Sequence, residues 1–160
     1  MLTVSDSRTA SDDRSGDKLV ELLEGAGHTL ADRSIVRDDV DVLITCLNRW
    51  VDDHSIDCII TTGGTGVTGR DVTPEALVRM GGKDIPGFGE LFRWLSYQKI
   101  GTSTIQSRAC AIVTRGTYIF ALPGSTGAVA DGWNGILASQ LDSRHRPCNF
   151  VELMPRLMER

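Results

Sequence analysis

Short apolar runs alternate with segments of helical spacing along the first part of the chain. In order, they predict a strand at 1–5, a helix around 19–26, a strand within 28–36, a helix over 40–51 and a strand at 57–62. This order is typical of a parallel sheet with right-handed crossovers. The pattern therefore predicts an α/β fold. In such folds, ligands bind outside the carboxyl ends of the strands.

The second half of the chain continues in the same way. Thr73 is predicted to cap a helix whose first position is Pro74, where the missing N–H costs nothing. The later elements are a helix within 85–101, strands at 109–114 and 117–126, and a helix over 126–141. The tail has little regularity. With 160 residues, 41% of them hydrophobic, and no linker or repeat, we expect a single domain over 1–160.

The segment after the third predicted strand, TTGGTGVTGRDVTPEA at 61–76, contains four glycines and five threonines. A loop that only reverses the chain needs far fewer glycines. The segment satisfies the pattern G-x-G-x-x-G of dinucleotide sites, but the next helix is expected only at Thr73, and Glu90, about 20 positions on, lies in a helical stretch. It also misses the phosphate-loop pattern, because Arg70 and Asp71 replace its lysine and hydroxyl residue.

The same segment still offers successive amides, at residues 63 to 66, to phosphate oxygens. Asp71 would repel such a ligand unless a cation bridged them, and Mg²⁺ is the usual bridge. Asp71 is therefore a candidate metal-positioning residue. In the alternative interpretation, its carboxylate makes only an Asx-type turn before Val72.

Two further strand ends carry candidate residues. In LPGSTG at 122–127, Gly124, Ser125 and Thr126 can donate to an anion at a helix N-terminus, although simple helix capping explains them equally well. The second predicted strand is followed by Asp38 and Asp39, of which at least one is expected to cap the next helix.

Composition excludes several classes of protein. With 17 Lys+Arg against 21 Asp+Glu, a net charge of −4 and no basic run, a nucleic-acid partner is not expected. No apolar run reaches the length of a membrane span. Three of the four cysteines lie in apolar runs, which predicts buried free thiols and a cytoplasmic protein: Cys46, Cys58 and Cys110. The abrupt first strand leaves open a longer natural N-terminus.

Five segments, in order, resemble the molybdenum cofactor biosynthesis protein B (MoaB/MogA) family: LTVSDSR, TTGGTGVTGRDVTPEA, IPGFGELFR, GTSTIQSRA and ALPGSTGAV. The tail QLDSRHRPCNF resembles the MoaB branch in particular. The resemblance implies a three-layer α/β/α sandwich with a mostly parallel central sheet. It also implies that the chain binds molybdopterin and, with ATP and Mg²⁺ as in active members, adenylylates it and releases pyrophosphate.

The resemblance also implies roles for individual residues. Asp71 matches one catalytic, magnesium-positioning aspartate, and Asp38 matches the other, with Asp39 as the alternative. The ligand-binding segments match the following residues: Thr62, Gly63, Gly64, Thr65, Gly66, Ser107, Arg108, Gly124 and Ser125. Arg108 or Arg70 would supply a further cation.

Family members form trimers, or hexamers in the MoaB branch, so a homo-oligomer is expected. In the helix within 85–101, Leu91, Phe92 and Leu95 can face the core, which leaves Trp94 and Tyr97 for another surface such as a subunit interface. Two other functions remain open: a non-catalytic molybdopterin-binding protein, and a scaffold module like that of gephyrin.

Overall fold

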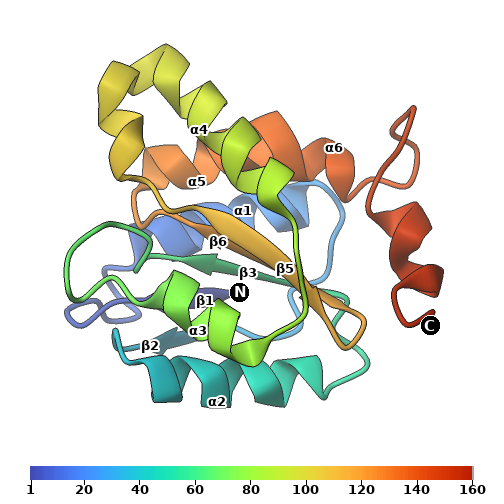
Figure 1. Ribbon diagram of the computed structural model, residues 1–160, viewed down its shortest axis with the longest axis horizontal. Helices are drawn as coiled ribbons and strands as arrows, with labels where there is room; N and C mark the ends of the chain where they lie inside the picture. Colours follow the sequence, from blue (N-terminus) through green and yellow to red (C-terminus); the bar gives the residue numbers. More distant parts are fainter. Residues whose placement is uncertain (160) are drawn as a thin grey trace.

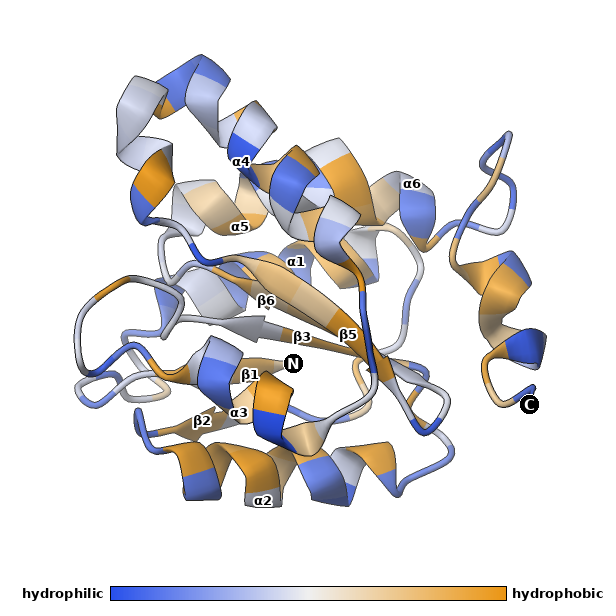
Figure 2. Cartoon of the chain, in the orientation of Figure 1, coloured by the Kyte–Doolittle hydropathy of each residue, from blue (hydrophilic) through white to orange (hydrophobic). Residues whose placement is uncertain are grey.

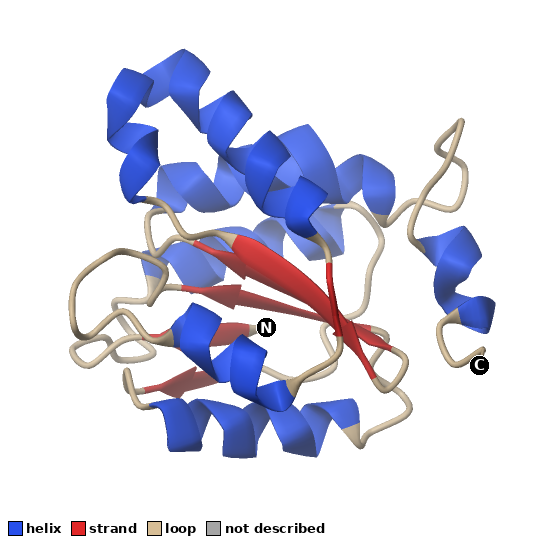
Figure 3. Ribbon diagram, in the orientation of Figure 1, coloured by secondary structure: helices blue, strands red, loops and turns tan. Residues whose placement is uncertain are grey.

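A mixed six-stranded sheet forms the centre of the molecule. The computed structural model describes residues 1–159. The sheet has the order β2-β1-β3-β6-β5-β4 (Figures 1 and 3). Its strands are β1 (Leu2–Val4), β2 (Ser34–Val36), β3 (Cys58–Thr62), β4 (Lys83–Asp84), β5 (Cys110–Thr114) and β6 (Thr117–Leu122).

The strand pairings confirm a mostly parallel sheet. β1 pairs in parallel with β2 and β3, and β3 with β6, whereas β5 runs antiparallel to both β6 and β4. The carboxyl ends of β1, β2, β3 and β6 therefore lie at one edge, as the order of apolar runs predicted. The two-residue strand β4 was not predicted, because KD carries no apolar pattern of its own.

Helices cover both faces of the sheet, which confirms the three-layer α/β/α sandwich. Their bounds are α1 (Arg14–Gly25), α2 (Val40–Val51), α3 (Thr73–Met80), α4 (Pro86–Ile100), α5 (Thr126–Gly132) and α6 (Ala138–Gln140). A π-helical turn joins α5 to α6, so the long final helix is confirmed. α2 and α3 cover one face of the sheet, and α1, α4 and α5 cover the other (Figure 1).

Side-chain alternation along the central strands builds two cores. Ile60 and Phe120 pack with α1, α4 and α5 in one core, while their neighbours Ile59 and Ile119 pack with α2 and α3 in the other. Figure 2 shows hydrophobic residues concentrated on the strands and helices, with mostly hydrophilic or neutral loops at the carboxyl ends of the strands. These loops therefore contribute few hydrophobic side chains to the two cores.

Two local predictions need correction. Thr73 does not cap α3: the helix begins at Thr73 itself, and the capping position, Val72, makes no side-chain hydrogen bond. The hydroxyl of Thr73 instead donates to the carbonyl oxygen of Gly63 at 2.9 Å, which anchors α3 to the glycine-rich loop.

The second correction concerns the thiols. Cys46, Cys58 and Cys110 are free, as predicted, but only partly buried, and Cys148 is exposed. Burial still raises the pKa of Cys58 to about 12 and that of Cys110 to about 11. Within residues 1–159, no helix is both long enough and apolar enough to cross a membrane.

Gly63 marks the tightest backbone approach at the carboxyl edge of the sheet. Its φ is 106°, and a Cβ at this position would lie 2.1 Å from the carbonyl oxygen of Val4 at the end of β1. Only glycine has both the conformation and the clearance required here. In contrast, a Cβ on Gly69, in the same loop, would meet nothing within 4 Å.

We predict that Gly63→Ala lowers the free energy of unfolding by about 1–3 kcal/mol or more, because it adds backbone strain and a clash with the carbonyl oxygen of Val4. Gly69→Ala, the matched control, should change the free energy of unfolding by less than about 0.5 kcal/mol. Urea denaturation of the two variants measures the difference, and equal effects would contradict the prediction.

Candidate functional site

The two predicted phosphate-binding loops lie side by side. The glycine-rich loop follows β3, and the loop of Gly124 and Ser125 follows the neighbouring strand β6. The hydroxyl of Thr62 donates to the carbonyl oxygen of Pro123 at 3.0 Å. A Cβ on Gly124 would lie 3.2 Å from the Cα of Gly63, so the two backbones are in contact. Ser125 accepts from the amide of Ala128 and caps α5, as the capping interpretation predicted.

The two predicted acids come from different strand ends and lie against the same loop. A Cβ on Gly64 would lie 3.2 Å from Oδ1 of Asp38, and a Cβ on Gly66 would lie 2.7 Å from Oδ2 of Asp71. The carboxylate of Asp38 therefore lies against Gly64, and that of Asp71 lies against Gly66. Larger residues at either glycine would push an acid away.

The choice between the neighbouring acids after β2 follows from their contacts. Asp39 is the N-cap of α2, and its carboxylate accepts from the amides of Asp41 and Val42, both at 3.0 Å. The capping prediction is confirmed for Asp39. Asp38 lies against Gly64 instead, so it is the acid that the structure brings to the loop.

The pKa values of Asp38 and Asp71 are shifted in opposite directions. Burial is the largest cause that raises the pKa of Asp38 above its usual value, and the negative charges of Asp6 and Asp71 raise it further. Burial acts in the same direction on Asp71, but hydrogen bonds from the hydroxyl and amide of Thr68 and from the amide of Gly66 outweigh it and lower the pKa of Asp71. Asp38 is thus the acid whose negative charge is the less well compensated.

Arg108 braces the glycine-rich loop from behind. Its Nε donates to the carbonyl oxygen of Gly66 at 2.6 Å, and its Nη2 donates to that of Asp71 at 2.7 Å. Its guanidinium also forms an ion pair with Glu75 of α3, which lowers the pKa of that carboxyl. Arg70 is likewise paired, with Asp6. Both arginines are therefore paired with carboxylates, and the charge of Arg108 also contributes to the lowered pKa of Asp71.

The walls of two pockets include residues that lie close to the candidate site. One, of about 590 Å³, is lined by Ser107 and Arg108 together with Arg93 of α4. The other, of about 510 Å³, lies beside the ends of β1 and β2 and is lined by Ser5, Arg8, Arg33 and Arg37, among others. Neither pocket is lined by Asp38, by Asp71 or by the loop at 63–66.

The sequence of the chain is similar to those of known proteins. Residues 1–143 match the sequence profile of the family described as "Probable molybdopterin binding domain". The chain belongs to this family. It is 45% identical over 150 residues to molybdenum cofactor biosynthesis protein B of Escherichia coli K12, covering 94% of this chain and 88% of the relative. The protein of the same name from Bacillus subtilis is 43% identical over 142 residues, covering 88% and 84%.

Solved structures confirm the fold. A crystal structure of a molybdenum cofactor biosynthesis protein B superposes with a TM-score of 0.84 at 41% identity, covering 88% of both chains. The tungsten cofactor synthesizing protein MoaB of Pyrococcus furiosus superposes with a TM-score of 0.74 at 35% identity, covering 86% of this chain and 88% of that one. The resemblance to the MoaB/MogA family is therefore confirmed over most of the chain.

Three residues beside the site of this molybdopterin-binding domain were not predicted: Asp6, Arg8 and Glu75. Oδ1 of Asp6 accepts from the amide of Asp38 at 3.2 Å, and Arg8 donates to the carbonyl oxygen of Gly124 at 2.6 Å. Both follow β1 directly, so the rule applied to the other strand ends would have found them. Glu75 lies inside the helix of the RDVTPEA motif and carried no separate signal.

The raised pKa of Asp38 predicts that this acid destabilises the ligand-free fold. A carboxyl with a higher pKa in the folded state opposes folding wherever it is ionised, and this effect disappears below the unfolded value of 3.8. Asp38→Asn should therefore raise the melting temperature at pH 7 by a few degrees, and the gain should shrink as the pH is lowered toward 4.

Asp39→Asn is the matched control for this measurement. Asparagine caps helices as well as aspartate does, and hydrogen bonds from the amides of Val42 and Asp41 lower the pKa of Asp39, so no gain is expected there. Thermal denaturation of both variants between pH 4 and pH 8 tests the difference. A lower melting temperature for Asp38→Asn at pH 7 would overturn it.

Proposed function

We propose that the chain acts in molybdenum cofactor biosynthesis, where it binds molybdopterin and adenylylates its terminal phosphate with Mg-ATP, releasing pyrophosphate. Family membership supports the pathway and the pterin ligand. The observation that carries the transfer chemistry is the placement of Asp38 and Asp71, from different strand ends, against the Gly64–Gly66 loop.

The acids fit a magnesium ion that is shared with substrate phosphates. Within residues 1–159 no group of three or more His, Cys, Asp and Glu side chains is placed to hold a metal ion. Mg²⁺ is commonly held by one or two carboxylates together with substrate phosphates, which matches Asp38 and Asp71. When bound, the ion would neutralise phosphate charge and relieve the repulsion from Asp6 and Asp71, which adds to the effect of burial on the pKa of Asp38.

The backbone supplies the remaining phosphate contacts. The amide of Gly63 is not available, since it donates to the carbonyl oxygen of Leu122 at 2.9 Å, so the prediction that residues 63 to 66 all donate needs correction. The amides of Gly64 and Thr65 donate to no other group in the described part of the chain. These two uncharged amides form a candidate anion-binding site next to the two acids. Gly63 supports this site through its positive φ, which sets the course of the loop.

The proposed reaction requires little covalent participation from side chains. A terminal phosphate oxygen of molybdopterin forms a bond to the α-phosphorus of ATP as the bond from that phosphorus to the pyrophosphate oxygen breaks. The chain aligns the two phosphates and holds their negative charge between loop amides and the ion-positioning acids. The ion pair of Arg108 with Glu75, and the hydrogen bond from Arg108 to the carbonyl oxygen of Gly66, keep the loop in place.

The experiment is a pyrophosphate-release assay with ATP, Mg²⁺ and molybdopterin. We predict that Asp71→Asn lowers turnover at least about 100-fold and leaves molybdopterin affinity within a few-fold, because it removes a charge that acts on the transferred group. Asparagine keeps an oxygen that can accept from Thr68, so the loop turn survives better than in Asp71→Ala. Asp39→Asn should keep full activity.

The outcomes separate the candidate functions. Equal loss of binding and turnover in Asp71→Asn would show a structural role. Molybdopterin binding without pyrophosphate release by the unaltered chain would leave a non-catalytic binding protein.

We further propose that the chain assembles into a homo-oligomer through α4. Four apolar side chains, spaced three residues apart along this helix and winding around it, have exposed fractions of 42–61%: Leu91, Trp94, Tyr97 and Ile100. Leu91 was expected in the core and is instead exposed, whereas Phe92 is buried as predicted. Several exposed apolar side chains on neighbouring turns of one helix support a protein interface there.

We predict that the unaltered chain sediments as a trimer or hexamer and that Trp94→Glu dissociates it, because a charge would be buried in the interface. Val78→Glu alters an apolar side chain of α3 that is 75% exposed and should leave the assembly intact. Sedimentation velocity measures both variants. A monomeric unaltered chain, or equal dissociation by both changes, would contradict the proposal.

A further inference from the structure

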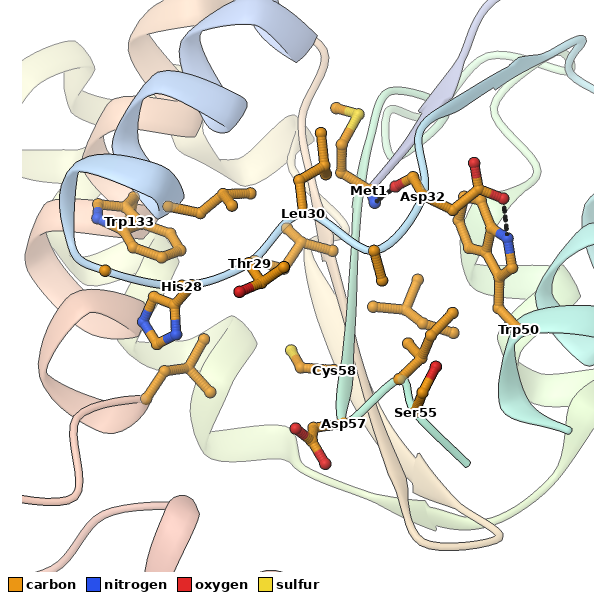
Figure 4. A pocket seen from close by; sticks show the side chains of 17 residues that line it. Met1, His28, Thr29, Leu30, Asp32, Trp50, Ser55, Asp57, Cys58 and Trp133 are labelled. Carbon is orange, nitrogen blue, oxygen red and sulfur yellow. Dashed lines mark hydrogen bonds between the residues drawn. The ribbon is translucent and has the colours of Figure 1, made fainter. Parts of the chain in front are cut away.

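Three pockets of the described chain differ in the charge of the side chains that line them. A pocket of about 370 Å³ beside Met1, at the amino edge of the sheet, has Asp32 and Asp57 in its walls (Figure 4). Asp84 and Glu90 line the pocket of about 590 Å³. Among residues 1–159, no aspartate or glutamate lines the pocket of about 510 Å³ at the ends of β1 and β2. We call it the arginine pocket, after its charged lining residues: Arg8, Arg33 and Arg37.

The arginine pocket adjoins the candidate functional site. Arg8 follows β1 and donates to the carbonyl oxygen of Gly124, after β6, at 2.6 Å. Gly124 lies against Gly63, so this one contact links the pocket to the glycine-rich loop. Arg37 follows β2 directly and immediately precedes Asp38. An anion in this pocket would therefore be a neighbour of phosphates held at the loop.

A buried carboxylate holds two of the three arginines in place. Asp13 is fully buried, accepts from Nη2 of Arg33 at 2.9 Å and lies 3.6 Å from Nη1 of Arg8. Burial acts to raise the pKa of Asp13, but hydrogen bonds from Thr3, Arg33 and the amide of Gly16 outweigh it and lower this pKa. Asp13 is therefore ionised, and the guanidinium groups of Arg8 and Arg33 share its single buried charge.

The three arginines keep donors for a ligand. In the described part of the chain, Nε of Arg8 and both Nε and Nη1 of Arg33 donate to no other group. The carboxylate of Asp39 lies 3.9 Å from Arg37, and that of Asp17 pairs with Arg33 while 61% exposed. Exposed ion pairs of this kind contribute little to stability, so a multiply charged anion can replace them.

Hydroxyl groups add uncharged donors to the same walls. The Oγ of Ser5 accepts from the amides of Ser7 and Arg8, which leaves its hydrogen available to donate. Ser34, at the start of β2, also lines the pocket. Walls with several donors, three cations and no acid favour an anion with many oxygens, because each oxygen can accept from a guanidinium or a hydroxyl.

We propose that the arginine pocket binds a pyrophosphate group. The choice of this anion rests on the proposed function, since ATP carries such a group as its β- and γ-phosphates and the reaction releases it. Arginine binds phosphate oxygens through paired N–H donors and needs no metal ion to do so. The arginine pocket thus differs from the site of Asp38 and Asp71, which is proposed to accept phosphates only together with a cation.

The test is isothermal titration calorimetry of the unaltered chain with inorganic pyrophosphate in the presence of EDTA. Without divalent ions, the acids beside the glycine-rich loop repel the anion, so binding reports the arginine pocket. Arg37→Gln should weaken this binding at least about tenfold, because it removes a charged donor.

Arg49→Gln is the matched control. Arg49 is 64% exposed, against 67% for Arg37, and is likewise paired with one aspartate, but it lies outside the pocket. Its removal should change the affinity less than about twofold, since salt screens distant charges. Asp38→Asn should not weaken the binding, because it removes a negative charge next to Arg37.

Two nucleotides identify the source of the pyrophosphate group. If Arg37→Gln also weakens the binding of ATP, the pocket holds the β- and γ-phosphates of the nucleotide. If it leaves ATP binding unchanged, the pocket holds the released product. AMP lacks the group, so its binding should not depend on Arg37.

Several outcomes would overturn the proposal: a Kd for pyrophosphate above about 1 mM, equal weakening by Arg37→Gln and Arg49→Gln, or AMP binding that depends on Arg37 as strongly as pyrophosphate binding does. None of these measurements needs turnover. A chain that binds pyrophosphate in this pocket but releases none from ATP would therefore contradict the proposed adenylylation and support the arginine pocket.

Discussion

The close approach of three strand ends around Gly63 is the constraint on which the site depends. The backbone at Gly63 lies beneath the carbonyl of Val4 from β1, against Gly124 after β6, and within reach of the hydroxyl of Thr73 at the start of α3. A side chain at this point would separate these segments. Because they are in contact, the acids after β2 and in the loop after β3 meet at one loop.

The electrostatics of this loop are built in two layers. Arg108 and Glu75 form an ion pair, and Arg108 also holds the carbonyl groups of Gly66 and Asp71. Asp38 and Asp71 lie against Gly64 and Gly66 of the same loop, where the pKa of Asp38 is raised and that of Asp71 is lowered. The negative charge of Asp38 is therefore unfavourable in the ligand-free fold, which supports the proposal that a cation binds there.

The two edges of the sheet have different roles in this arrangement. At the carboxyl edge, loops with few apolar side chains leave backbone groups for a ligand. At the amino edge, apolar side chains from both cores line the pocket beside Met1. Since β1 also leads to Asp6 and Arg8 beside the site, the anchoring of its first residues and the position of the site residues involve the same short strand.

The sequence alone was enough to predict the order of the helices and strands and to single out the glycine-rich loop after β3. Apolar runs and glycine clusters are local patterns, so the strands at 1–5 and 57–62, the helices at 40–51 and 126–141, and the segment TTGGTGVTGRDVTPEA were recognisable without coordinates. Only the tertiary structure showed that Asp39 caps α2 and that Asp38 lies against the glycine-rich loop. Each is a plausible helix cap in sequence, and the cap is assigned by the amides that a carboxylate reaches. It likewise showed that Arg108 is a brace, that Thr73 anchors a helix without capping it, and that Gly63 gives its amide to the sheet. These roles depend on partners that lie far away in sequence, and only packing brings such partners within hydrogen-bonding distance.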